Sequence, residues 1–368
     1  MNPRPTPPAA RAFRAVSRRA LLRAGCGGVA ALAARGFGPT PAALARQGMA
    51  GEPVALGVYL LDVLDDPAVL EDFATAIGRT PAYAVWYEGW AGNHFGPWQQ
   101  AHLDTFDAWG MTPVISWDPF DPHGDPIDQP AFKLANIARG DFDAYVDSWA
   151  AGLVAYGKPV YVSFAHEMNG NWTPWGIGVN GNEPGDFILA WRHVHDRFTA
   201  ASATNVRWVW TPNEDYEGVP ALAATVYPGD DYVDWFGMNG FNWGAAVHWA
   251  NCDCQSAWRT FKQVFDTTYA NLQRLGEKPI MIGETASSEV GGDKGGWISR
   301  AMLYDLPTNY PQVRAFTWFN KVATGLDTIA PGNVVTTTAV DWPVTSSQAA
   351  LAAFSHAASF SYYQGSLP

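Results

Sequence analysis

Two glutamates in this sequence end apolar segments, which is a position from which carboxylates often act. Glu167 ends the run "KPVYVSFAHE", and Glu284 ends the run "KPIMIGE". Both runs have the apolar, β-forming character of a buried strand. Two carboxylates can divide a displacement reaction between a general acid and a nucleophile. We therefore expect Glu167 to be the catalytic acid and Glu284, in its ionised form, to be the nucleophile.

Aromatic and polar side chains surround the first of these glutamates. His166 precedes Glu167, and Asn169, Trp172 and Trp175 follow it in a loop rich in Gly and Pro. The chain has 18 Trp and is 14% aromatic but only 16% charged, so we expect many indoles to line a binding surface. Flat apolar rings that also carry an N–H suit sugar rings. Facing carboxylates among indoles predict glycoside hydrolysis, with retention if the carboxyl groups lie about 5 to 5.5 Å apart.

Other readings of these acidic residues are weaker. Any single Glu at a strand end can be a helix cap or an ion-pair partner, and we rank Glu214 and Glu289 below the pair for that reason. A zinc protease motif, H-E-x-x-H, needs a second His where this chain has Asn169. We predict no metal and no cofactor.

Eight short apolar runs alternate with helix-like segments, which is typical of βα units. The strand candidates are 54–60, 83–86, 112–117, 159–164, 206–210, 233–237, 279–282 and 313–318. The main helix candidates are 67–77, 142–156, 184–200, 257–275 and 346–359. This order predicts an α/β fold, a single-domain (β/α)8 TIM barrel over residues 46–368, with the two glutamates across its mouth. A doubly wound open sheet is the alternative, but no Gly-rich phosphate loop follows any run.

Five segments resemble glycoside hydrolase family 26. They are "HEMNGNWTPWG" at 166–176, "WTPN" at 210–213, "YPGDDYVDWFGMNGFNWG" at 227–244, "KPIMIGETASSE" at 278–289 and "FTWFNK" at 316–321. The resemblance runs from about residue 54 to 321, and its first segment is quite specific. It implies a retaining (β/α)8 enzyme from a family that includes endo-β-1,4-mannanases and endo-β-1,3-1,4-glucanases (lichenases). It also implies the same roles for Glu167 and Glu284 as above.

The resemblance implies contacts to substrate as well. It places His166 against the sugar at the cleavage site, makes Trp172 an aromatic residue of a sugar subsite, and places Trp318 under the reacting sugar. The remaining substrate-binding candidates are Asn169, Trp175, Asn213, Phe241 and Trp243. Phe241 departs from the family pattern, because many members carry there a Tyr whose hydroxyl bonds to the nucleophile. A lost charge-assisted hydrogen bond of this kind costs about 1.5 to 3 kcal/mol, and Asn242 is the candidate to replace it.

Indoles outside these roles fall into two groups. We expect those within strand candidates to pack the barrel, namely Trp86, Trp210 and Trp235. We expect those in the loops after the second and sixth strand candidates to contact sugar, namely Trp90, Trp98, Trp243 and Trp249. The acidic loop at 117–128 suits either Ca²⁺ or Pro-punctuated Asp turns, of which the turns are commoner.

The first 45 residues differ from the rest in charge, with seven Arg and no Asp or Glu. "SRRALL" at 17–22 resembles a twin-arginine export signal, and an apolar run at 29–34 and an A-x-A site at 43–45 follow it. We expect residues 1–45 to be a removed signal peptide and the enzyme to be secreted or periplasmic. The alternative is a disordered basic arm. Removal lowers the net charge from −12 by seven to −19, which argues against nucleic acid or anionic membranes as partners.

The cysteines add little to this reading. Cys26 would leave with the signal, and Cys252 and Cys254 form a C-x-C that suits a small disulfide in an exported protein. We therefore expect a monomeric, secreted endo-β-glycanase acting on β-1,4-mannan or glucomannan. The alternatives are an endo-β-1,3-1,4-glucanase of the same family and a barrel that binds polysaccharide without cutting it.

Overall fold

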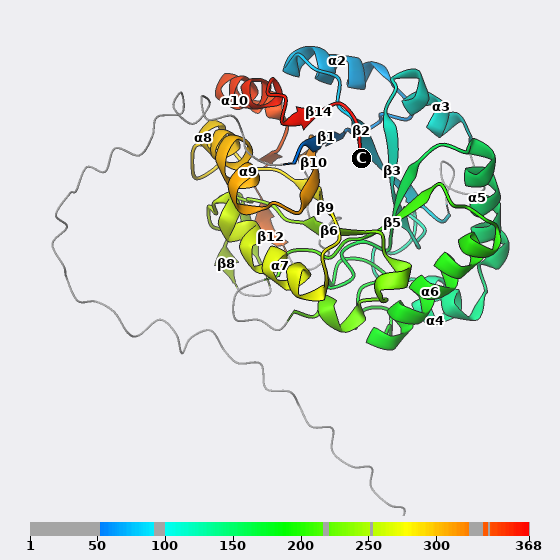
Figure 1. Ribbon diagram of the computed structural model, residues 1–368. Coiled ribbons are helices and arrows are strands. Elements are labelled where there is room, and N and C mark those ends of the chain that lie inside the picture. The colour runs from blue at the N-terminus through cyan, green and yellow to red at the C-terminus, as the bar shows by residue number, and fades with distance from the viewer. Residues whose placement is uncertain are drawn as a thin grey trace, which may run out of the picture. The chain divides into compact units, whose positions relative to one another are not determined.

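The computed structural model describes residues 52–91, 100–215, 221–250, 253–323, 334–337 and 339–367. Eight parallel strands in this part of the chain close into a barrel, with helices around its outside (Figure 1). Their order is β10, β9, β6, β5, β4, β3, β2 and β1, and β1 pairs with β10 to close the ring. The barrel strands are β1 Val54–Tyr59, β2 Tyr83–Gly89, β3 Thr112–Asp118, β4 Val160–Phe164, β5 Val206–Trp210, β6 Trp235–Asn239, β9 Ile280–Thr285 and β10 Val313–Phe319. The predicted TIM barrel is confirmed, and each of the eight strand candidates overlaps a barrel strand.

Helices connect the strands and cover the outside of the barrel. They are α2 Ala68–Ile77, α3 Gln100–Ala108, α4 Leu134–Arg139, α5 Asp143–Tyr156, α6 Pro184–Ala200, α7 Phe261–Leu275, α8 Lys294–Arg300, α9 Leu306–Asn309 and α10 Gln348–Ala358, with a π-helical turn at Ala301–Asp305. α7 begins later than predicted because the Thr260 side chain and Gln263 form a capping box at its start.

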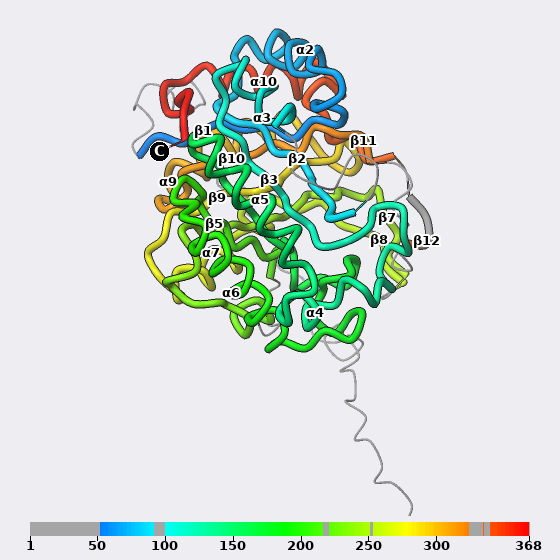
Figure 2. Tube along the Cα trace, turned by 90° about the vertical axis from the view of Figure 1, so that its right-hand side faces the viewer, coloured from blue at the N-terminus to red at the C-terminus, as the bar shows by residue number. Residues whose placement is uncertain are grey.

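Short antiparallel strands extend the loops at the end of the barrel where the parallel strands end. They are β7 Val247–Trp249, β8 Cys254–Gln255, β11 Val322–Ala323, β12 Val334–Thr337 and β13 Val340–Asp341. Figure 2 shows β7, β8 and β11 gathered at this end, and β14 (Tyr363–Gln364) pairs instead with the start of β1. These loops form the mouth of the barrel.

Side chains alternate along each strand between the barrel interior and the helix layer. Tyr83 fills the interior, and its hydroxyl lies 2.8 Å from Oγ1 of Thr317 on β10. Gly57 on β1 makes room for that ring, since a Cβ at this position would lie 2.2 Å from it. The interior is therefore a packed core that supports the mouth from below.

The helix layer is rich in aromatic contacts. Trp86, Trp210 and Trp235 are buried, as expected of packing residues. Trp90 is buried as well, with its ring 4.8 Å from Trp117, so the expectation that it contacts sugar is wrong. The reason is that Trp90 turns back toward the helices just after β2. Trp98 lies outside the described residues.

Several other expectations concern the loops and the membrane. Among the described residues no helix is long and apolar enough to cross a membrane. In the acidic loop, Oδ1 of Asp125 accepts from the backbone N–H groups of Ile127 and Asp128, which makes an Asp turn. Cys254 is disulfide-bonded, whereas Cys252 lies outside the described residues.

Candidate active site

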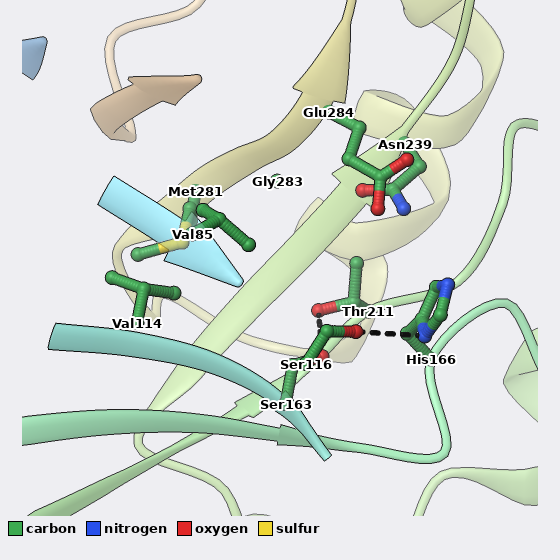
Figure 3. A pocket seen from close by; sticks show the side chains of 10 residues that line it. All are labelled: Val85, Val114, Ser116, Ser163, His166, Thr211, Asn239, Met281, Gly283 and Glu284. Atoms are coloured by element: carbon green, nitrogen blue, oxygen red, sulfur yellow. Dashed lines mark hydrogen bonds between the residues drawn. The ribbon is translucent and has the colours of Figure 1, made fainter. Parts of the chain in front are cut away.

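A bulge in β9 turns Glu284 toward the barrel axis. Between β6 and β9, Met238 pairs with Ile282 but the next residue, Asn239, pairs with Glu284, so Gly283 is an extra residue in β9. Without this bulge, strict alternation from Met281 and Gly283 would send Glu284 outward to the helices. Both Gly283 and Glu284 instead line the interior (Figure 3).

The chain after β4 presents Glu167 from the other side of the mouth. Ala165 and Glu167 have φ of +48° and +53°, left-handed values that are uncommon for residues with a Cβ. The Glu167 N–H donates to the carbonyl of Thr211 at 2.7 Å, which fixes this turn against the end of β5. Strained backbone of this kind clusters at functional sites, where surrounding structure holds it in place.

Donors on two elements hold the Glu167 carboxylate. Nδ2 of Asn239 donates to Oε1 at 3.0 Å, and Nε1 of Trp172 donates to Oε2 at 2.8 Å. Asn239 is also the pairing partner of Glu284 across β6 and β9, so it stands between the two carboxylates. Trp172 therefore contacts the carboxylate that the sequence assigned as the acid, and its ring is half-buried.

The surroundings of Glu284 disfavour its ionised form. Burial, together with the nearby Glu167 carboxylate, raises the pKa of Glu284 to about 7, against the opposing influence of His166 and Tyr87. Glu284 is therefore partly protonated near neutral pH, whereas we expected it to be ionised.

Tyr87 is a site residue that the sequence reasoning missed. It lies on β2, and its hydroxyl donates to Oε1 of Glu284. Alternation in β2 could have revealed it, because Tyr83 and Val85 point into the barrel and Tyr87 is the next inward position. Asn242, the expected replacement for the family hydroxyl, instead donates to Oγ of Ser287 and is fully buried, so that expectation is wrong.

His166 lies beside the carboxylate pair as a cation. Its Nδ1 is 2.9 Å from Oδ1 of Asp118 and 2.9 Å from Oγ of Ser116, both on β3. Burial disfavours the charged ring, but Asp118, Glu284 and Glu167 together raise the pKa of His166 to about 10. A protonated imidazole here places positive charge next to the two glutamates.

A small cavity of about 20 Å³ lies below the pair, in the barrel interior (Figure 3). The residues around it include His166, Asn239 and Glu284. This volume suits one water molecule and is far too small for a sugar ring. This cavity is therefore not the place where a sugar would bind.

Three predicted binding residues make hydrogen bonds within the loops, and a sugar contact of the half-buried Asn169 and Asn213 stays a prediction. Asn169 and Asn213 exchange two hydrogen bonds, of 2.9 and 2.8 Å, which tie the loop after β4 to the loop after β5. Trp175 is 2% exposed, and its Nε1 donates to the carbonyl of His166 at 2.6 Å. The expectation that Trp175 contacts sugar is therefore wrong. The buried Trp175 indole instead holds the backbone of His166 in place.

Trp318 is not beneath the substrate. Thr317 and Phe319 point into the barrel, so the intervening Trp318 points outward, where it is fully buried and 5.4 Å from the ring of Phe354 on α10. Its Nε1 donates to the carbonyl of Trp342 at 2.9 Å. The aromatic residue that β10 sends to the mouth is Phe319, which stacks on Tyr59 at 4.5 Å.

Four aromatic side chains form one side of the mouth, and we call this cluster the aromatic wall. Its members are Phe241, Trp243, Phe319 and Trp342. Phe241 stacks on Trp342 at 4.7 Å, and Trp243 is half-buried with its ring 5.3 Å from that of Trp249 on β7. Phe241 and Trp243 thus both belong to this wall, and their contact with sugar stays a prediction.

The lower-ranked glutamates have structural partners. Arg259 donates to both carboxylate oxygens of Glu214, at 2.5 and 2.6 Å, and also to the carbonyl of Phe241. Glu289 accepts from Oγ of Ser346 at 2.6 Å. In the described ranges, no group of three or more His, Cys, Asp or Glu side chains is arranged to hold a metal ion.

The chain is similar in sequence to known proteins. The model of the family described as glycosyl hydrolase family 26 matches residues 72–278. Endoglucanase H of Acetivibrio thermocellus is 36% identical over 264 residues, which is 71% of this chain and 26% of that protein. A β-1,3-xylanase of a Vibrio species is 32% identical over 127 residues, 32% of this chain and 26% of that protein. The chain thus spans about a quarter of the length of these relatives.

A solved structure shows the same fold. The GH26 β-mannanase from Bacteroides ovatus superposes with a TM-score of 0.57 at 18% identity, covering 85% of this chain and 90% of that one.

Proposed function

Because the chain belongs to glycoside hydrolase family 26, we propose that it is an endo-acting β-glycanase that hydrolyses its substrate with retention of configuration. The observation that carries this proposal is the pair Glu167 and Glu284, presented from β4 and β9 with Asn239 between them. Each carboxylate has its own donor, Trp172 on Glu167 and Tyr87 on Glu284.

These contacts support separate roles for the two carboxylates. Tyr87 and the charged His166 both favour the ionised form of Glu284, which is the form that a nucleophile needs. In the first step Glu284 attacks the anomeric carbon while Glu167 gives its proton to the leaving glycosidic oxygen. In the second step Glu167 takes a proton from water, which attacks the same carbon and releases Glu284.

For the substrate, we propose mixed-linkage β-1,3-1,4-glucan in place of the mannan first expected. The support is Endoglucanase H, which is named for glucan hydrolysis and matches 71% of this chain at 36% identity. The mannanase from Bacteroides ovatus, at 18% identity, supports the fold alone. Mannan is therefore the second candidate, and it rests on the family resemblance.

Release of reducing sugar tests the substrate directly. Purified protein should release it from barley β-glucan faster than from galactomannan, glucomannan or β-1,3-xylan, and the Glu284→Ala protein should release none. Faster cleavage of galactomannan would restore the mannan assignment. No release from any of the four would favour the non-catalytic binding barrel.

We also propose that the basic N-terminal segment directs export. The support is its composition, seven Arg without Asp or Glu, and the Arg18–Arg19 pair. Residues 1–45 fused to a folded reporter should carry it across the membrane, and changing both arginines to Lys should stop this. Continued export of the Lys-Lys form would contradict a twin-arginine signal.

A further inference from the structure

Lys294, the first residue of α8, is a buried cation that the reaction does not use. Its side chain is 1% exposed. The ammonium donates to the carbonyls of Asp341 and Pro343 and to Oγ of Ser346, the last two at 2.8 Å. An ammonium has three N–H donors, so each has an acceptor. All three acceptors belong to the short segment 341–346.

This segment carries Trp342 of the aromatic wall. Lys294 holds the carbonyls of the residues immediately before and after Trp342, and Trp318 donates to the carbonyl of Trp342 itself. The Trp342 indole then stacks on Phe241 and lies 5.4 Å from Phe319. Only 2% of Trp342 is exposed, so it acts as backing for its neighbours in the wall.

We propose that Lys294 is a positioning residue for glycan binding, which holds segment 341–346 so that Trp342 keeps Phe241 and Trp243 in place. The proposal rests on the proposed function, because the wall matters as a surface for sugar. Lys294 itself touches no substrate. Its effect should therefore fall on binding more than on the chemical step.

The charge of Lys294 gives this role a dependence on pH. The acidic groups facing it are Glu289 and Asp341, and its Nζ also lies 5.9 Å from the ring of Trp318. Burial lowers the pKa of Lys294 to about 8, against the opposing influence of these two acids. A neutral amine has two N–H donors for three acceptors. One of the contacts to segment 341–346 is then lost as the pH rises through about 8.

Global unfolding would have the opposite dependence on pH. The unfolded Lys keeps its proton up to the ordinary pKa of 10.5, whereas the folded one loses it near 8. Between these values the unfolded chain binds more protons, so this group makes folding stability rise with pH. Weaker glycan binding in that range would therefore report a local change at the wall.

Binding measured by calorimetry in the inactive Glu284→Ala protein tests the proposal. Its affinity for a mixed-linkage β-glucan hexasaccharide should fall about tenfold between pH 7 and 9.5, the effect of one lost charge-assisted hydrogen bond. Adding Lys294→Met to the Glu284→Ala protein should give weak binding throughout this range, without the fall in affinity between pH 7 and 9.5. Ser346→Ala should also remove the fall in affinity with pH. Only the carbonyls of Asp341 and Pro343 then remain as acceptors, and they match the two N–H donors of the neutral amine. Lys262→Met, at a surface lysine paired with Asp266, should leave the fall in affinity unchanged.

A readout without ligand separates this proposal from the substrate assignment. The near-ultraviolet circular dichroism of tryptophan should change across pH 8 in the protein with Lys294 and stay constant with Lys294→Met. If the hexasaccharide does not bind at any pH while this change persists, the substrate is wrong and Lys294 still holds the wall. The proposal would be overturned if affinity and circular dichroism depended on pH in the same way in the Lys294, Lys294→Met and Ser346→Ala proteins.

Discussion

The hydroxyl of Tyr87 on β2 donates to the carboxylate of Glu284 on β9, although β1 and β10 lie between these strands in the barrel. Phe241 follows β6, the neighbour of β9 on its other side, and has no hydroxyl to offer. The family resemblance led us to expect a hydrogen bond to Glu284 from the β6 side, and here Tyr87 donates one from the β2 side. The substitution at Phe241 therefore leaves Glu284 with a donor.

Tyr87→Phe should lower kcat/KM about tenfold to a hundredfold, since a hydrogen bond to a charged group contributes about 1.5 to 3 kcal/mol. The change removes one oxygen and keeps the ring against Tyr59, which lies at 4.9 Å. Initial rates on β-glucan measure the effect. Tyr156→Phe is the matched control, because Tyr156 also donates to a carboxylate, Asp107, but far from the site. Equal rates for the wild-type and Tyr87→Phe proteins would show that the contact is dispensable.

Glu284→Gln should stabilise the protein at pH 7.5 while abolishing activity. The pKa of Glu284 rises from 4.5 to about 7 on folding, so between these values the folded chain binds more protons than the unfolded chain. Stability from this group is complete below pH 4.5 and is lost as pH rises through about 7, a loss of order 3 kcal/mol. Glutamine keeps an acceptor for Tyr87 without the charge. Calorimetric melting should show the gain at pH 7.5 and little difference near pH 4.5, and a gain independent of pH would contradict this account.

Gly283→Ala should reduce activity far more than it reduces stability. A Cβ on Gly283 would lie 2.6 Å from Oδ1 of Asn239, and Asn239 holds Glu167 through its Nδ2. Displacing Asn239 disturbs both carboxylates at once. We expect kcat to fall at least about tenfold, as misplaced catalytic groups lose far more than that. Gly185→Ala, where no atom lies within 4 Å of the added Cβ, should leave kcat unchanged and raise the melting temperature slightly, because Gly185 lies in α6 and Ala favours a helix more than Gly does.

The barrel and its carboxylate pair could be predicted because their signals are local. Each strand is a short apolar run, and both glutamates directly follow or end such a run. The bulge at Gly283 could not be read in this way, since it depends on how β9 pairs with β6 and β10.

Errors at the aromatic positions share one physical cause. Whether an indole faces sugar or helix depends on its place in the alternation along a strand, and "FTWFN" gives Trp318 and Phe319 with no sign of which points inward. Trp342 escaped prediction because it reaches the mouth from a loop after β13, held there by Lys294. Alternation in β2 indicates that Tyr87 points inward, but the identity of its partner, Glu284, leaves no local pattern because the two residues are distant in sequence.

The last prediction separates the two glutamates by their roles in the two-step reaction. Glu284→Ala should abolish turnover of every glycoside, because no glycosyl-enzyme can form without the nucleophile. Glu167→Ala should spare the first step for an aryl glycoside with a good leaving group, which needs little protonation. The glycosyl-enzyme should then accumulate, giving a burst of aryl alcohol followed by slow release.

Azide shows directly which glutamate is the general acid and base, because a small anion can attack the glycosyl-enzyme without a general base. Added azide should speed turnover by the Glu167→Ala protein and give a β-glycosyl azide, which nuclear magnetic resonance distinguishes from the α form. Rescue at Glu284→Ala with an α product would mean that the roles are reversed. Full activity in either alanine variant would remove the retaining mechanism, because both carboxylates, joined through Asn239, are required for it.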